Sequence, residues 1–254
     1  SNASSAGPSV AEARRIAWTG GVLALAVTSA IAIPVAIFPA ATAAAFTTDP
    51  AVRAIRLRGH GRAFCAGRDV SAAPTDKDLE LVQAVSRAIV AHRCPVIAAV
   101  HGWTVGAGFE WMMNADIVFA AADARFKLPE ASLGVFVTGG LVATLPAAIG
   151  PMRAKALTLL GEPFDAAQAL AWGLVYRSVP ADQLDAVSLA AARRIADLKP
   201  EVAREVKRVL NQIGPARFEQ RIECAKDLHG QFHAPFHRHL GVEVFDHRGA
   251  EEIE

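Results

Sequence analysis

The chain is poor in cysteine, in tyrosine and in net charge. It has 254 residues, of which three are cysteine and one is tyrosine, and its formal net charge at pH 7 is +1. The cysteines Cys65, Cys94 and Cys224 are odd in number and form no CxxC pair. We therefore expect reduced thiols and a cytoplasmic location. The balanced charge argues against a nucleic-acid partner, because phosphate contacts require a basic surplus.

Charged residues are also absent from the whole stretch between Ile16 and Thr48. Roughly 20 apolar residues can span a bilayer, so a membrane helix is one interpretation of this stretch. It is, however, interrupted by Gly20, Gly21, Pro34 and Pro39. Val22–Thr28 alternates as a strand does, and the alanine-rich Pro39–Phe46 suits a helix. We favour a buried strand, a loop and a short helix, and we expect no membrane partner.

The remaining segments predict a mixed chain with strands early and helices late. Further strands are expected at 52–57, 96–100, 117–121 and 125–128. Helices are expected after a capping box of Thr75 and Asp78, from Pro151 to Gly161, from Asp165 to Gly173, and at 182–198 and 201–213. This order predicts an α/β or α+β class with a helical C-terminal part. Residues 1–3, SNA, look like a tag remnant and are left out of the fold.

Two segments share one pattern. RLRGHGRAFCAGRD and AAVHGWTVGAGFE each run from a strand through a Gly/His turn into a loop of small residues. Successive crossovers have the same handedness, so both loops are expected on one side of the fold. Backbone amides at a helix start near Ala107, together with the amide of Arg68, could stabilise negative charge on a ligand. The alternative is that the glycines only permit close packing of helix and sheet.

Two glutamates stand out because of their surroundings. Glu110 lies in GFEWMM, among apolar residues, where a carboxylate is costly unless it is protonated or hydrogen-bonded. Its pKa is expected to rise, which suits a general acid or base. Glu130, in FKLPEASLG, follows a proline that ends the preceding strand; taken alone, it is more often a solvated loop acid.

These motifs occur in an order that is typical of one family. FCAGRD, HGWTVGAGFE and FKLPEASLG, followed by GPMRAKALTLLGEPFDAAQALAWGLVYRSVP, resemble the enoyl-CoA hydratase/isomerase (crotonase) superfamily from about Asp49 to Leu210. The resemblance implies an α/β fold built as a spiral of ββα units. It implies a core over residues 4–195 and a helical C-terminal region over 196–254 that forms homotrimers or dimers of trimers.

The resemblance also implies a substrate and a set of site residues. The substrate is an acyl-CoA thioester, so CoA belongs to the substrate and no separate cofactor or metal is expected. The catalytic acids are Glu110 and Glu130, and the oxyanion hole is formed by the backbone amides of Arg68 and Ala107. Substrate-binding positions are expected at Arg62, Ala66, Gly67, Asp69, Gly106 and Gly139. Retention of both glutamates favours a hydratase; an isomerase, another acyl-CoA enzyme and a catalytically silent scaffold are the alternatives.

Some positions depart from the family pattern. Ser29–Phe46 lacks the asparagines and the arginine that usually line the CoA entrance, and Phe136–Gly140 replaces a proline- and glycine-rich loop. Lys127 stands where a small residue is common. His229 and His233 have the spacing of a metal pair on a helix, but a solvated or interfacial helix face is the preferred interpretation. Cys65 is expected to be a small core residue rather than a nucleophile.

Overall fold

The computed structural model describes residues 17–19, 22–28, 52–67 and 75–213. Its larger sheet has six strands in the order β1-β2-β3-β4-β6-β9. These strands are β1 (Ala17–Thr19), β2 (Val22–Thr28), β3 (Ala54–His60), β4 (Val96–Val100), β6 (Ile117–Ala121) and β9 (Arg177–Val179). Only the β1–β2 pair is antiparallel, and the other neighbours in this sheet are parallel. Such parallel pairs need crossover connections, which helices supply here.

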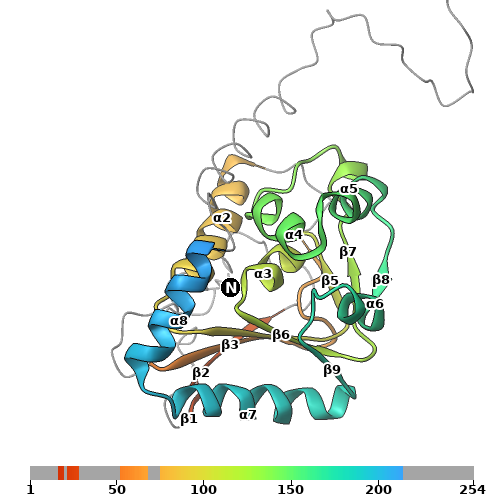
Figure 1. The fold of residues 1–254 in the computed structure, drawn as a ribbon. Helices are drawn as coiled ribbons and strands as arrows, with labels where there is room; N and C mark the ends of the chain where they lie inside the picture. Colours follow the sequence, from red (N-terminus) through yellow and green to blue (C-terminus); the bar gives the residue numbers. More distant parts are fainter. Residues whose placement is uncertain (1–16, 20–21, 29–51, 68–74, 214–254) are drawn as a thin grey trace, which may run out of the picture.

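The smaller sheet has three strands and lies near α5 and α6 (Figure 1). It contains β5 (Trp103–Val105), β7 (Arg125–Lys127) and β8 (Phe164–Asp165). The helices are α2 (Asp76–Ala91), α3 (Ala107–Asn114), α4 (Leu141–Ile149), α5 (Pro151–Leu160), α6 (Ala166–Ala171), α7 (Leu184–Ala196) and α8 (Pro200–Ile213), with 3₁₀ turns η1 (Ala131–Leu133) and η2 (Ala181–Gln183).

The large sheet is covered on both faces. Figure 1 shows α7 along one face and α2, α3 and α4 above the other. All five residues of β4 are buried, as expected for a central strand of a covered parallel sheet. Ile97 and Ala99 pack with the α7 cluster, whereas Val96 and Val100 belong to the main core. The alternation of the strand thus divides one sequence between two hydrophobic layers.

An aromatic cluster joins α3 to the smaller sheet. Phe109 makes edge contacts with Phe126 and Phe164, at centroid distances of 6.0 and 5.7 Å, and Phe126 stacks on Phe164 at 5.3 Å. All three rings are buried. This cluster anchors α3, whose first turn carries Glu110.

Most predicted elements are found, including the mixed α/β class. The strand over Val22–Thr28 forms β2, and β4 and β6 have the predicted bounds. The capping box of Thr75 and Asp78 opens α2, and Asp165 caps α6. β3 begins later and extends further than expected, because it pairs with β2 as far as His60. β5, β8, β9 and α4 were not predicted; the strands have two or three residues each, and α4 contains Pro146.

Part of the charge-poor N-terminal stretch forms strands β1 and β2. In the described part of the chain, no helix is long and apolar enough to cross a membrane. The expected helix over Pro39–Phe46 and the histidines of the C-terminal tail lie outside the described residues.

Candidate active site

The start of α3 forms one wall of a pocket of about 140 Å³. Gly106, just before the helix, has φ +56° and ψ −124°, a conformation that L side chains rarely adopt. A Cβ at this position would also lie 3.1 Å from Oε1 of Glu130. The amide of Ala107, the first residue of α3, has no acceptor within the helix and belongs to the lining of the pocket. The backbone here can therefore approach a bound ligand closely.

The two small-residue loops lie side by side. The Cys65 carbonyl accepts a hydrogen bond from the Val105 amide at 2.9 Å, and the Cys65 amide donates to the Trp103 carbonyl at 3.3 Å. A Cβ at Gly108 would lie 2.5 Å from the Cβ of Cys65, so glycine is required where α3 contacts the first loop. This pairing brings Ala66 and Gly67 to the same pocket as Gly106 and Ala107. Arg68 and Asp69 lie outside the described residues.

Glu110 is buried and held by backbone donors. Its side chain is 2% exposed. Oε2 accepts from the Gly139 amide at 2.6 Å and from the Leu141 amide at 3.4 Å, and Oε1 accepts from the Thr138 amide at 3.3 Å. Burial, reinforced by the nearby charge of Glu130, raises the pKa of Glu110 to about 8, although the three amides act in the opposite direction.

Glu130 reaches the same pocket from the other side. It follows β7 and precedes η1, and it is 9% exposed. Burial raises the pKa of Glu130 to about 7. Its Oε2 atom is buried and has no hydrogen-bond partner, so this oxygen lacks the backbone donors that partly offset burial at Glu110. Two acids with raised pKa values on one pocket can exchange protons near neutral pH.

Gly139 is held by α3 at both its amide and its carbonyl. Its N–H donates to Glu110, and its carbonyl accepts from Nδ2 of Asn114 at 2.7 Å. A Cβ at Gly139 would lie 2.7 Å from Oγ of Ser86 and 3.0 Å from Oε2 of Glu110, so a larger residue would displace one of these side chains. Sequence reasoning missed Asn114. Its position four residues after Glu110, on the same helix face, was the available signal.

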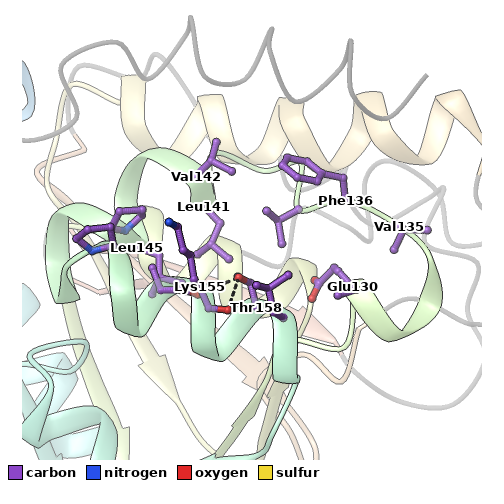
Figure 2. A pocket seen from close by; sticks show the side chains of 14 residues that line it. Glu130, Val135, Phe136, Leu141, Val142, Leu145, Lys155 and Thr158 are labelled. Atoms are coloured by element: carbon purple, nitrogen blue, oxygen red, sulfur yellow. Dashed lines mark hydrogen bonds between the residues drawn. The ribbon is translucent and has the colours of Figure 1, made fainter. Parts of the chain in front are cut away.

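A second pocket adjoins the first. It has a volume of about 260 Å³ and lies between α4, α5 and the segment after η1 (Figure 2). Glu130, Val135 and Phe136 line both pockets. The candidate site is therefore a pocket with two carboxyl groups and a second, largely apolar compartment next to it.

Other expected site residues lie elsewhere. Arg62 is exposed and lines a separate pocket with His101 and Asp123. Gly139 is not among the residues that line the 140 Å³ pocket; its N–H contacts Glu110 instead. The thiol of Cys65 is largely buried, and burial raises its pKa, which is unfavourable for a nucleophile. Among the described residues, no group of three histidines, cysteines or acids is placed to hold a metal ion.

Comparison with known proteins agrees with the family resemblance seen in the sequence motifs. The family model for enoyl-CoA hydratase/isomerase matches residues 40–252. A Mycobacterium tuberculosis protein named "Probable enoyl-CoA hydratase" is 35% identical over 195 residues, which cover 74% of each chain. The 2,3-dehydroadipyl-CoA hydratase of Escherichia coli is 31% identical over 206 residues, covering 79% of this chain and 80% of that protein.

Solved structures agree with this result. The crystal structure of an enoyl-CoA hydratase from Mycobacterium avium subsp. paratuberculosis superimposes with a TM-score of 0.81 at 28% identity, covering 87% of this chain and 93% of that one. The crotonase-like fold expected from the motifs is thereby confirmed. Because the family model spans most of the sequence and the fold agrees, the chain belongs to the enoyl-CoA hydratase/isomerase family, the crotonase superfamily.

Proposed function

We propose that the protein is an enoyl-CoA hydratase, which adds water across the 2,3 double bond of an enoyl-CoA thioester. The observation that carries the proposal is the presence of two buried carboxyl groups, Glu110 and Glu130, on one pocket with Ala107, the first residue of α3. Relatives whose names specify hydration of enoyl-CoA thioesters support the same reaction.

The amide of Ala107 stabilises the charge that develops during the reaction. When water attacks the β-carbon, electron density moves through the conjugated system onto the thioester oxygen. A donor aimed at that oxygen lowers the barrier by about 3 kcal/mol in oxyanion sites of this kind. The amide of Arg68 is the proposed second donor.

The glutamate pair handles the protons. With pKa values of about 8 and about 7, the pair carries close to one proton and one negative charge near neutral pH. The charged member takes a proton from the attacking water, and the neutral member gives one to the α-carbon. The β-carbon gains a C–O bond and the carbon–carbon double bond becomes single. The pair still holds one proton, now on the other carboxyl, and proton exchange between the two acids restores the starting state.

The hydrogen bonds of Glu110 favour one of its two oxygens as the position of its proton, when the proton is present. Oε2 accepts from two amides, one of them at 2.6 Å, whereas Oε1 accepts only a longer bond. A hydroxyl at Oε2 would direct its hydrogen toward amide hydrogens, so we assign the proton to Oε1.

The proposal is tested with crotonyl-CoA. Hydration removes the conjugation and therefore the ultraviolet absorbance of the enoyl thioester. Glu110→Gln and Glu130→Gln are each expected to lower kcat by about 10²- to 10⁴-fold, the usual contribution of a general acid or base. Glu162→Gln, at an exposed position, is the matched control and should retain the wild-type rate.

Other outcomes identify the alternatives. Full activity of Glu130→Gln would contradict the two-acid mechanism. An absorbance increase with a 3-enoyl-CoA, without loss of absorbance from crotonyl-CoA, would indicate an isomerase. Binding of acyl-CoA with neither reaction would indicate a scaffold.

We further propose a homotrimer or a dimer of trimers. In support, α8 carries an exposed apolar stripe of Val202, Val206, Val209 and Leu210, at positions spaced to share one helix face. An exposed stripe of this kind is typical of a protein–protein contact.

A further inference from the structure

Buried polar side chains lie where α2 packs against α3. On α2, Gln83 and Ser86 are both 0% exposed. In the described part of the chain, neither polar atom of the Gln83 amide has a hydrogen-bond partner, and neither does the Ser86 hydroxyl. Oδ1 of Asn114, on α3, is also buried and unpaired there. Buried polar groups without partners are rare in folded proteins, so this group calls for a physical explanation.

Helical spacing places the two α2 residues next to the candidate site. Positions three, four and seven residues apart share one helix face, and one such face of α2 carries Leu79, Val82, Gln83 and Ser86. Leu79 and Val82 line the pocket of about 140 Å³. Nε1 of Trp111 donates to the Val82 carbonyl at 3.3 Å and so holds this face against α3. The face therefore continues from the pocket wall to Gln83 and Ser86.

Ser86 lies beside the carboxyl group of Glu110. A Cβ at Gly139 would be close to both Oγ of Ser86 and Oε2 of Glu110, so the two oxygens approach the same side of Gly139. Asn114 also borders Gly139, because its Nδ2 donates to the Gly139 carbonyl at 2.7 Å. Ser86 and Glu110 are not hydrogen-bonded to each other. A polar contact that is too long for a direct bond is commonly bridged by water.

We propose that Ser86 is a positioning residue for Glu110: together with Gln83 and Asn114, it holds an internal water that donates a hydrogen bond to Oε2 of Glu110. The water accepts from the Ser86 hydroxyl and from Nε2 of Gln83, and its second hydrogen goes to Oδ1 of Asn114. Buried waters typically make about three such bonds to polar groups that are otherwise unpaired. The inference rests on the proposed function, because it takes Glu110 to transfer protons in the reaction.

The water stabilises the charged form of Glu110 from the side of α2. Backbone amides already donate to the carboxyl group, and burial raises the pKa of Glu110 to about 8. Loss of a further donor raises this pKa, because the anion loses a hydrogen bond. Glu130 and Asp78 are the other acids among the residues that line the pocket, and neither 135–140 nor α4 contains a titratable residue. A change at Ser86 is therefore measured at Glu110.

The kcat–pH profile of Ser86→Ala tests the proposal. Its alkaline limb should lie about half to one pH unit above that of the wild type, the value of one hydrogen bond. Ser86→Thr keeps a hydroxyl and should restore the wild-type limb. The matched control is Ser188→Ala, which removes the hydroxyl of another fully buried serine, on α7, and should leave the limb in place. An unmoved limb in Ser86→Ala, or an equal shift in Ser188→Ala, would overturn the proposal.

Gln83→Met tests whether the water is shared. The change removes both polar atoms of the amide and keeps the length of the side chain. The alkaline limb should again move upward. In the double variant with Ser86→Ala, the shift should be smaller than the two single shifts added together, because either change releases the same water. Additive shifts would refute a water that both residues hold.

Thermal unfolding and crystallography give measurements that do not depend on turnover. Replacing a buried, unpaired polar group by an apolar one is neutral or stabilising, whereas replacing one that binds a water is destabilising. Ser86→Ala and Gln83→Met should therefore lower Tm, and a higher Tm for either would count against the site. A crystal structure of the wild type should show an ordered water within about 3.2 Å of Oγ of Ser86, and clear density without one would refute the proposal.

Failure of the water site and failure of the reaction are distinguishable. Hydration of crotonyl-CoA with the same pH profile in Ser86→Ala and the wild type would refute the positioning role and leave the hydratase proposal intact. An ordered water at Ser86 and a lowered Tm, in a protein that hydrates no enoyl thioester, would support the water site and refute the reaction.

Discussion

Burial makes the charged form of Glu130 costly in the folded protein. Its pKa is about 7 in the folded protein, against an ordinary value of 4.5, because burial penalises the charged form. Between these two pH values the unfolded chain releases a proton that the folded protein keeps. The folded state therefore loses stability as the pH rises from about 4.5 to about 7, and this loss is absent below 4.5.

Glu130→Gln is accordingly expected to stabilise the protein at pH 8 while it lowers the rate of hydration. The gain should be about 1–3 kcal/mol at pH 8 and should vanish at pH 4, because both side chains are then neutral. Thermal unfolding at the two pH values measures it, with each kcal/mol moving Tm by about 2–4 °C. Equal stability of variant and wild type at pH 8 would contradict the buried charge.

Asn114 is predicted to set the pKa of Glu110 through Gly139. Asn114→Leu leaves the Gly139 carbonyl without its donor and loosens the amide that bonds Glu110 at 2.6 Å. The carboxylate then loses stabilisation, so the alkaline limb of the kcat–pH profile should move above its wild-type position near pH 8.

The control for this change is Asn211→Leu on α8, which removes a hydrogen bond from an asparagine amide to the Val90 carbonyl in α2. It should leave the pH profile in place. A profile that shifts equally in both variants would show that the effect of Asn114 is general and not specific to Glu110.

At the scale of elements, α8 is attached to the fold by an ion pair whose lysine is buried. Nζ of Lys207 lies 2.8 Å from Oδ2 of Asp116 and donates to the carbonyls of Ile89 and Cys94. Asp116 also accepts from the Val96 amide at 2.6 Å. The pair thus connects α8 to the end of α2, to the start of β4 and to the residue before β6.

Lys207→Met is expected to destabilise the protein by about 1–3 kcal/mol, because it removes the partner of the partly exposed Asp116 carboxylate and the donor to two backbone carbonyls. Urea unfolding measures the loss. The control is Arg208→Met, which breaks the exposed pair of Arg208 with Glu205 on the same helix and should have little effect. Similar unfolding midpoints for the two variants would show that the pair of Lys207 and Asp116 does not hold α8 against the rest of the fold.

At the scale of the whole molecule, the stripe on α8 predicts assembly. Val206 is 53% exposed in the single chain, and Val206→Glu places a charge in the middle of the stripe. We expect a trimer or hexamer for the wild type and a smaller species for the variant, measured by light scattering after size exclusion. Gln212→Glu adds the same charge away from the stripe and should keep the wild-type mass. A monomeric wild type would contradict the proposed assembly.

The domain division at residue 195 and the cytoplasmic location stay predictions.

The sequence by itself determined the class, most elements and the identity of the two acids. Local sequence preferences predict several of these features: the strands β4 and β6, the capped helices α2 and α6, and the two glycine loops. β5, β8 and β9 were not predictable in this way, because strands of two or three residues are defined by their partners rather than by a pattern.

Only the tertiary structure decided what surrounds the acids. Residues far apart in sequence place Glu110 against the amides of Thr138, Gly139 and Leu141, leave Oε2 of Glu130 without a partner, and open the second pocket between α4 and α5. The pKa of a carboxyl depends on its desolvation and on the donors around it, and both are properties of packing between segments. The sequence therefore names the acids, and the fold sets their proton affinity.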